Sequence, residues 1–306
     1  MTLDPAALWT ALGVTTLLGV ATLSVTLLAR RGKIPPAGRK ELYQRIRTWA
    51  ILAPLLILPF VLGPIAIKIG SGLLGVLCFR EFSRATGLFR ERAVTLVTHA
   101  AIILLTLASL FGSESLWMAA TPLLALSIVV AGILKDQPDG YLQRVSLGLL
   151  GFLLFGVCFA HLGLLADRLP NGRVFLWLLL CVALNDVGAY LCGRLWGRRK
   201  LCPVTSPNKT VAGAVGAVIL TSGISAVAGT ALALPFASLP MLLLAGALCS
   251  VAGTVGDLII SSIKRDLHIK DMSAALPGHG GILDRFDSLV PAAPCLFYFL
   301  IACSLA

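Results

Sequence analysis

The sequence contains little charge. Only 13% of its 306 residues are Asp, Glu, Lys or Arg, 58% are hydrophobic, and the mean hydropathy is +0.93. A composition this apolar excludes a water-soluble protein. Acidic residues are scarcest, 14 against 25 basic ones, which leaves a net charge of +11. Because the bases lie in short loops beside apolar runs, they set membrane topology and attract anionic headgroups, and no nucleic-acid partner is expected.

Paired cysteine motifs are also absent. The eight cysteines show no CxxC spacing and mostly lie within apolar runs. This pattern argues against a thiolate metal site or a disulfide framework, and we interpret the cysteines as small hydrophobic residues. His99 and His161 each stand alone in an apolar stretch, and we interpret them as core residues as well.

Apolar runs make up most of the chain, and about ten are long enough, or nearly so, for a membrane span of about 20 residues. The predicted spans are 6–29, 49–66, 69–82, 93–112, 116–134, 146–166, 174–193, 211–233, 239–263 and 288–305. The first has no basic region before it, so a retained helix is expected rather than a cleaved signal peptide. The third is short and is expected to form a tight hairpin with the second around Lys68.

The predicted fold is an all-α polytopic membrane protein with about ten transmembrane helices, whose polar cytoplasmic loops form the active site. Residues 1–170 are expected to supply the N-terminal helices, and residues 171–306 the catalytic region of the same membrane unit. With the N-terminus outside, every Lys and Arg except Lys68, Arg168 and Arg173 falls in an inside loop. This arrangement satisfies the positive-inside rule and places the polar segments in the cytoplasm.

The densest polar stretch is SSIKRDLHIKDMSAALPGHGGILDRFD, from Ser261 to Asp287. Asp257 lies just before it in an apolar run, where a charge is costly unless it is paired or bound to metal. If this run is a helix, Asp257, Ser261 and Lys264 share one face. Carboxylates suit Mg2+ together with phosphate oxygens, and neighbouring bases suit phosphate.

The glycines of the same stretch suggest close approach of a ligand. Gly280 and Gly281 follow His279 and leave the backbone accessible, and successive N–H groups can form an anion-binding nest. A loop whose charges are merely solvated is the structural alternative. His279 could shuttle a proton, but its place between flexible glycines favours a positioning role.

A second polar segment begins where Asn185 and Asp186 interrupt an apolar run. An Asp within a spanning helix is a candidate functional residue. Further along, Gly193 and Gly197 have the GxxxG spacing that lets a neighbouring helix pack closely.

A turn is predicted after this helix, at Ser206-Pro207-Asn208. It would present a hydroxyl, an amide and Lys209 at the membrane surface, where they could hold a phosphate. An ordinary structural turn with an exposed lysine is the alternative.

Both polar segments resemble one enzyme family. The string Ser-x-x-Lys-Arg-x4-Lys-Asp followed by Leu-Pro-Gly-His-Gly-Gly-x-x-Asp-Arg-x-Asp is similar to the hallmark of the phosphatidate cytidylyltransferases, or CDP-diacylglycerol synthases. The order Asp-x-Gly-Ala-Tyr, Gly-Arg/Lys-x-x-Gly and Ser-Pro-x-Lys-Thr resembles the other polar loop of that family. The resemblance covers about residues 180–306.

The resemblance implies that CTP and phosphatidic acid are converted to CDP-diacylglycerol and pyrophosphate. The expected cofactor is Mg2+, alone or with a second cation. The expected site residues are Lys264, Arg265, Lys270, His279 and Arg285 for catalysis; Asn185, Asp186, Ser206, Asn208, Lys209, Ser261, Gly280 and Gly281 for substrate binding; and Asp257, Asp284 and Asp287 for the metal.

Expected partners are CTP, phosphatidic acid, membrane lipids and, by family resemblance, a second copy of the chain in a homodimer. The expected location is a bacterial-type inner membrane with the site facing the cytoplasm. A CTP-dependent polyprenol or phytol kinase and a transporter of lipid or anions are the alternatives. The complete string from Ser261 to Asp287 argues against the kinase. The position of the acids toward one membrane face argues against a transporter, which tends to place them near the midplane.

Overall fold

The computed structural model describes residues 13, 15–16, 19–20, 22–27, 29, 36–111, 114–167, 172–234, 238–278 and 280–304. Its α-helices are α2 (Pro36–Leu62), α3 (Pro64–Ala85), α4 (Arg92–Leu110), α5 (Glu114–Ala131), α6 (Tyr141–Gly151), α7 (Cys158–Asp167), α8 (Arg173–Trp196), α9 (Val211–Ala231), α10 (Leu239–Asp266), α11 (Leu283–Phe286) and α12 (Leu289–Ser304). A 3-10 turn, η1 (Leu88–Arg90), precedes α4, and a π-helical segment, η2 (Phe152–Val157), joins α6 to α7. The only strands in the described part are β1 (Lys200–Cys202) and β2 (Ser206–Thr210), so the all-α class is confirmed.

Eight helical segments of the described chain are long and apolar enough to cross a membrane. They are Leu42–Leu62, Arg92–Leu110, Glu114–Ala131, Tyr141–Asp167, Arg173–Trp196, Val211–Ala231, Leu239–Asp266 and Leu283–Cys303. Each coincides with a predicted span, and together they confirm a polytopic membrane protein. The predicted span 6–29 lies largely outside the described residues. The predicted span 69–82 lies within α3, which is not among the eight and which includes buried Lys68 and Glu81.

The hairpin between α2 and α3 turns at Gly63, not around Lys68 as expected. Gly63 has φ 98°, a left-handed conformation that favours glycine, and Pro64 follows at the first position of α3. Lys68 is instead a buried residue of α3. Its Nζ lies 2.6 Å from a carboxylate oxygen of Asp167 at the end of α7, and donates to the Ser109 carbonyl at the end of α4.

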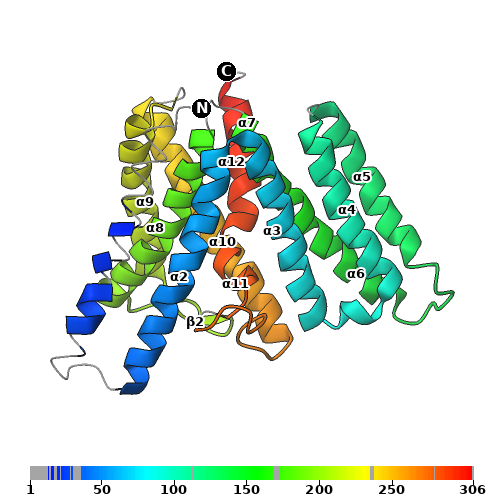
Figure 1. Ribbon diagram of the computed structural model, residues 1–306, viewed down its shortest axis with the longest axis horizontal. Helices are drawn as coiled ribbons and strands as arrows, with labels where there is room; N and C mark the ends of the chain where they lie inside the picture. The colour runs from blue at the N-terminus through cyan, green and yellow to red at the C-terminus, as the bar shows by residue number, and fades with distance from the viewer. Residues whose placement is uncertain are drawn as a thin grey trace.

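Helix α12 lies near the centre of the molecule (Figure 1). Helix α12 contacts α10 and α8 on one side and α7 on the other, while α8 packs closely on α9. Helices α4, α5 and α6 lie together at one edge of the molecule (Figure 1). The short elements β2 and α11 lie toward the same end of the bundle as the start of α2 and the end of α3, so the polar segments gather there.

The isolated histidines and the cysteines differ in how far they are buried. All eight cysteines are unpaired. His161 is buried against Trp117 and Phe297, with ring centroids 4.9 and 5.2 Å away. The ring of His99 packs on Phe79 at 4.7 Å. His161 is therefore confirmed as a core residue, and four of the cysteines, Cys78, Cys181, Cys192 and Cys249, are buried, whereas His99 and the other four cysteines are half-buried.

Candidate functional site

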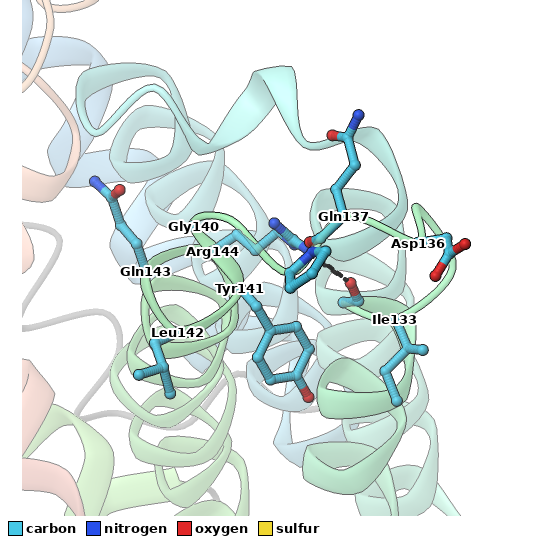
Figure 2. Close-up of a pocket in the computed structure, with 10 residues that line it drawn as sticks. Ile133, Asp136, Gln137, Gly140, Tyr141, Leu142, Gln143 and Arg144 are labelled. Atoms are coloured by element: carbon cyan, nitrogen blue, oxygen red, sulfur yellow. Dashed lines mark hydrogen bonds between the residues drawn. The ribbon is translucent and has the colours of Figure 1, made fainter.

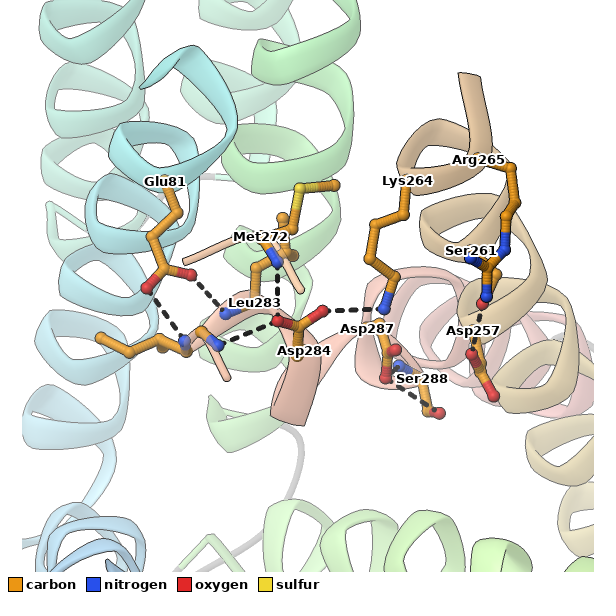
Figure 3. Close-up of polar contacts among 12 residues, drawn as sticks. Glu81, Asp257, Ser261, Lys264, Arg265, Met272, Leu283, Asp284, Asp287 and Ser288 are labelled. Atoms are coloured by element: carbon orange, nitrogen blue, oxygen red, sulfur yellow. Dashed lines mark hydrogen bonds and ion pairs between the residues drawn. The ribbon is translucent and has the colours of Figure 1, made fainter. Parts of the chain in front are cut away.

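The polar face predicted for α10 is present. Asp257 and Ser261 lie one turn apart, and the Ser261 hydroxyl donates to Asp257 Oδ1 at 3.0 Å. One turn further, Lys264 extends away from the helix and its Nζ lies 2.8 Å from Asp284 Oδ1 (Figure 3). The face therefore links a carboxylate at membrane depth to the C-terminal polar loop.

The second polar segment meets this face through a β-hairpin. The predicted turn at Ser206-Pro207-Asn208 is wrong, because these residues form β2, which pairs antiparallel with β1 across a turn at residues 203–205. Lys209 in β2 reaches α10, where its Nζ lies 2.5 Å from Asp257 Oδ2. Arg265 Nε donates to the Thr205 carbonyl at 3.2 Å. Residues about 50 positions apart in sequence thus form one polar region.

Close packing of small residues holds the hairpin against α8. A Cβ added to Gly197 would lie 2.6 Å from Thr210 Oγ1, and one added to Gly193 would lie 3.0 Å from the same atom. The Thr210 hydroxyl accepts a hydrogen bond from the Gly213 N–H and so caps α9. The expected close approach at the GxxxG spacing is confirmed.

A cavity of about 220 Å³ lies between α8, β2, α9 and α10. Five of the predicted site residues line it: Asn185, Asp186, Asn208, Lys209 and Asp257. The Asn185 side chain is buried and accepts a hydrogen bond from the Ser250 hydroxyl, which ties α8 to α10. Asp186 lies close enough to Asp257 and Lys209 for their charges to interact. This cavity can therefore receive a ligand that carries both charge and hydrogen-bonding groups.

The C-terminal loop folds around the carboxylate of Asp284, which is 9% exposed. Asp284 Oδ2 accepts hydrogen bonds from the Met272 and Gly281 N–H groups, each at 2.9 Å, while Oδ1 pairs with Lys264 (Figure 3). Three donors thus surround this carboxylate, which offsets the cost of its burial.

Glu81 of α3 is a site residue that sequence reasoning missed. Its carboxylate is 7% exposed and accepts hydrogen bonds from the Ser273 hydroxyl at 2.6 Å and from the N–H groups of Ile282 and Leu283 at 3.0 and 2.9 Å (Figure 3). It therefore satisfies free amides at the start of α11 from a helix about 200 residues away. In the sequence, the only indication of this role was that Glu81 is an acidic residue beside the hydrophobic Cys78, Phe79 and Phe82.

The glycines of the loop approach these two carboxylates. Gly280 has φ 80°, and a Cβ there would lie 2.9 Å from Asp284 Oδ2. A Cβ on Gly281 would lie 2.5 Å from Glu81 Oε2. The close approach expected at both positions is real, but the structure shows it toward protein carboxylates, and the Gly281 N–H is used by Asp284.

The remaining predicted residues differ in their burial and contacts. Asp287 is buried, accepts the Ser288 N–H at 2.8 Å and is close enough to Asp257 and Lys264 for their charges to interact. Arg285 is exposed and its charge interacts with that of Asp186. Lys270 is exposed, Ser206 is half-buried in β2, and His279 lies outside the described residues.

The donor chemistry of the predicted metal ligands fits magnesium, which proteins usually hold with one or two carboxylates and substrate phosphate oxygens. Asp257 and Asp284 supply such oxygens, and each has a lysine as its partner. In the described part of the chain, no group of three or more His, Cys, Asp or Glu residues is placed to hold a metal ion. A metal here would therefore need oxygen ligands from a substrate as well.

A larger cavity, about 590 Å³, opens between α5 and α6, away from the predicted residues (Figure 2). The guanidinium group of Arg144 lies in its wall, but it donates to the carbonyls of Gly132, Gln137 and Asp139. These bonds occupy four of the five guanidinium N–H groups. We therefore interpret Arg144 as a structural residue that binds carbonyls of the loop between α5 and α6.

Comparison with known proteins identifies one family over most of the chain. The profile described as the Cytidylyltransferase family matches residues 43–303. The phosphatidate cytidylyltransferase of Staphylococcus epidermidis RP62A is 32% identical over 264 residues, which cover 84% of this chain and 99% of that enzyme. The enzyme of the same name from Staphylococcus saprophyticus is 34% identical over 262 residues with the same coverage. The protein YnbB of Escherichia coli K12, described as uncharacterized, is 38% identical over 199 residues, or 63% of this chain and 66% of YnbB.

Proposed function

This chain belongs to the cytidylyltransferase family, and from that premise we propose that it transfers CMP from CTP to phosphatidic acid. The products would be CDP-diacylglycerol and pyrophosphate, in phospholipid biosynthesis. The names of the staphylococcal relatives support this substrate pair. The observation that carries the proposal is the Lys209–Asp257 ion pair, because it joins the two polar segments into one site beside the cavity.

The transfer requires little covalent chemistry from the protein. An oxygen of the lipid phosphate attacks the α-phosphorus of CTP, the bond from that phosphorus to the bridging oxygen breaks, and pyrophosphate leaves. Catalysis then depends on alignment of the two phosphates and on neutralisation of their charge. No general base is needed, because the attacking oxygen is already ionised.

The lysines of the site are the groups that we propose bind phosphate. Lys209 and Lys264 each lie against a carboxylate, and a triphosphate would offer both of them a second anionic partner. Arg265, Lys270 and Arg285 of the C-terminal polar segment are exposed and are further candidates for neutralising phosphate charge. In our proposal, Asp257 and Asp284, with support from Asp287, would hold Mg2+, alone or with a second cation. The bound cation would supply positive charge toward the triphosphate and the leaving group.

The apolar helices establish an integral membrane protein. We propose that it lies in a bacterial-type inner membrane with the site on the cytoplasmic face, where CTP is found, and that it works as a homodimer. Native mass measurement in nanodiscs tests the dimer, and a mass of one copy only would contradict it.

The central experiment incubates purified protein with CTP, magnesium and phosphatidic acid. With CTP labelled at the α-phosphate, we expect label in the lipid fraction and equimolar pyrophosphate. A kinase would instead release CDP and would transfer label only from the γ-phosphate to a polyprenol or phytol. Absence of α-label from the lipid at saturating CTP would refute the proposed reaction.

A further inference from the structure

An apolar groove of about 520 Å³ opens between α2 and α3. Its walls are residues Ile51 to Leu62 of α2 and Ala66 to Leu77 of α3, and its floor includes Phe175 of α8. Ser71 supplies the only polar side chain in the wall, and its hydroxyl donates to the Lys68 carbonyl within α3. The surface of the groove therefore suits a hydrocarbon chain and has no free group for a polar ligand.

One end of the groove is part of the candidate site. Leu276, Ile282, Phe286 and Leu289 line it, and they belong to the segment that carries Asp284 and Asp287. The groove is thus continuous with the polar loop. The Thr48 hydroxyl of α2 also donates to the Pro277 carbonyl at 2.9 Å, which fixes the cytoplasmic part of α2 to the same loop.

The other end of the groove is narrow. A Cβ on Gly70 would lie 3.3 Å from the Pro59 ring, so α2 and α3 almost touch there, four residues before the Gly63 turn. From Ile51 to Leu62 the helix rises about 16 Å at ~1.5 Å per residue. This is about half of the ~30 Å hydrocarbon core of a bilayer, which is the depth occupied by the acyl chains of one leaflet.

We propose that this groove binds an acyl chain of the phospholipid substrate and that its narrow end limits the length of the chain. The occupant is an amphiphile with an anionic head, because the apolar walls lead to the loop in which Lys264 pairs with Asp284. In the same loop, exposed Arg285 directly precedes Phe286 of the groove wall. The phosphate would lie at the polar end, with one chain running between α2 and α3. The inference rests on the proposed function, whose substrate it describes further.

The first test narrows the groove without touching the polar site. Leu55 lines the groove and is 60% exposed, so Leu55→Trp adds bulk with little effect on folding. We expect kcat/KM for dioleoyl phosphatidic acid to fall about tenfold, the effect of removing about two methylene groups from contact. With dioctanoyl phosphatidic acid and with CTP, we expect little change. The control Leu123→Trp on α5, 67% exposed and outside the groove, should leave both lipids unaffected.

The second test measures binding without turnover. Phosphatidic acid with a diazirine near the end of one acyl chain is activated in the absence of CTP, and we expect labelled peptides from α2 and α3. Equal labelling of α4 and α5 would indicate bulk lipid only and would overturn the inference. Disulfide formation between two copies at an introduced Leu55→Cys would show that a second copy fills the groove, with the same consequence.

The outcomes also separate the two proposals. If the wild type makes no CDP-lipid from either phosphatidic acid, the proposed function fails, and the labelling still reports on the groove. If the wild type makes CDP-lipid and Leu55→Trp keeps the wild-type ratio of kcat/KM for the two lipids, the groove inference fails alone.

Discussion

Replacement of Glu81 by alanine should release the C-terminal loop while leaving the helical bundle assembled. The carboxylate accepts hydrogen bonds from the Ile282 and Leu283 N–H groups and from the Ser273 hydroxyl, in a place where it is 7% exposed. Alanine offers no acceptor, so two backbone donors lose their partner. Each buried donor without a partner costs ~1–3 kcal/mol, which gives about 2–6 kcal/mol for the pair.

This cost is local, because the loop can open to water and hydrate its amides. We therefore expect the loss as disorder of residues 272–284 and as a lower kcat, since Asp284 and Lys264 depend on that loop for their relative position. Glu81→Gln keeps one acceptor oxygen and should lose about half as much. Activity that recovers in part with Gln, but not with Ala, would match a positioning role.

Hydrogen exchange in nanodiscs is the decisive assay. In Glu81→Ala, we expect the amides of Ile282 and Leu283 to exchange faster by about 30-fold or more, the equivalent of ~2 kcal/mol, with α9 unchanged. The control is Glu91→Ala, which removes a 3.0 Å ion pair with Lys135 outside the loop. Exposed pairs of this kind contribute ~0–1 kcal/mol, so this variant should behave as wild type. Wild-type protection of residues 276–283 in Glu81→Ala would refute the reasoning.

Other substitutions test the polar site and its orientation. Asp257→Asn should lower turnover by roughly a hundredfold, the order lost with one preorganised electrostatic group, with a loss of stability of at most about 1 kcal/mol from its partly exposed ion pair with Lys209. Asp284→Asn should also destabilise the loop, because an amide can no longer accept from every donor around it. Near wild-type activity of both variants at limiting magnesium would remove the proposed metal site. Lys209→Ala should raise the half-saturating concentration of CTP or lipid more than it lowers maximal turnover, and unchanged values for both substrates would exclude β2 from the site. In a background without native cysteines, a cysteine at exposed position 275 (Ala275→Cys) should react with an impermeant maleimide only from the cytoplasmic side. A cysteine at exposed position 111, at the far end of α4 (Phe111→Cys), should react only from the other side. The reverse labelling pattern would show that the proposed topology is inverted.

The sequence by itself was sufficient for the membrane class and for most of the spans. A bilayer requires about 20 apolar residues per helix and satisfied backbone groups, so each span is visible as a local run. Eight predicted spans coincide with helical segments of the structure, with ends that differ by up to seven residues. The shared face of Asp257, Ser261 and Lys264 was predictable for the same reason, because it depends only on helical periodicity.

Local patterns were not sufficient for α3 or for the hairpin. Helix α3 reads as a short span with charged ends, but its Lys68 and Glu81 are buried because Asp167 and the C-terminal loop supply partners from distant parts of the chain. The turn at Gly63 and the pairing of β2 with β1 likewise depend on contacts that the pattern of hydrophobic residues does not predict. Composition could not show which elements lie side by side.

Only the tertiary structure decided which groups each polar residue meets. The sequence placed Asp257 and Lys209 in separate segments, and their 2.5 Å contact exists because α9 returns the chain from β2 to α10. The carboxylates of Asp284 and Glu81 bind backbone amides, and the groove between α2 and α3 reaches the same loop. These contacts join residues up to about 200 positions apart. Burial and hydrogen bonding in the folded bundle stabilise them, so local sequence patterns could not predict them.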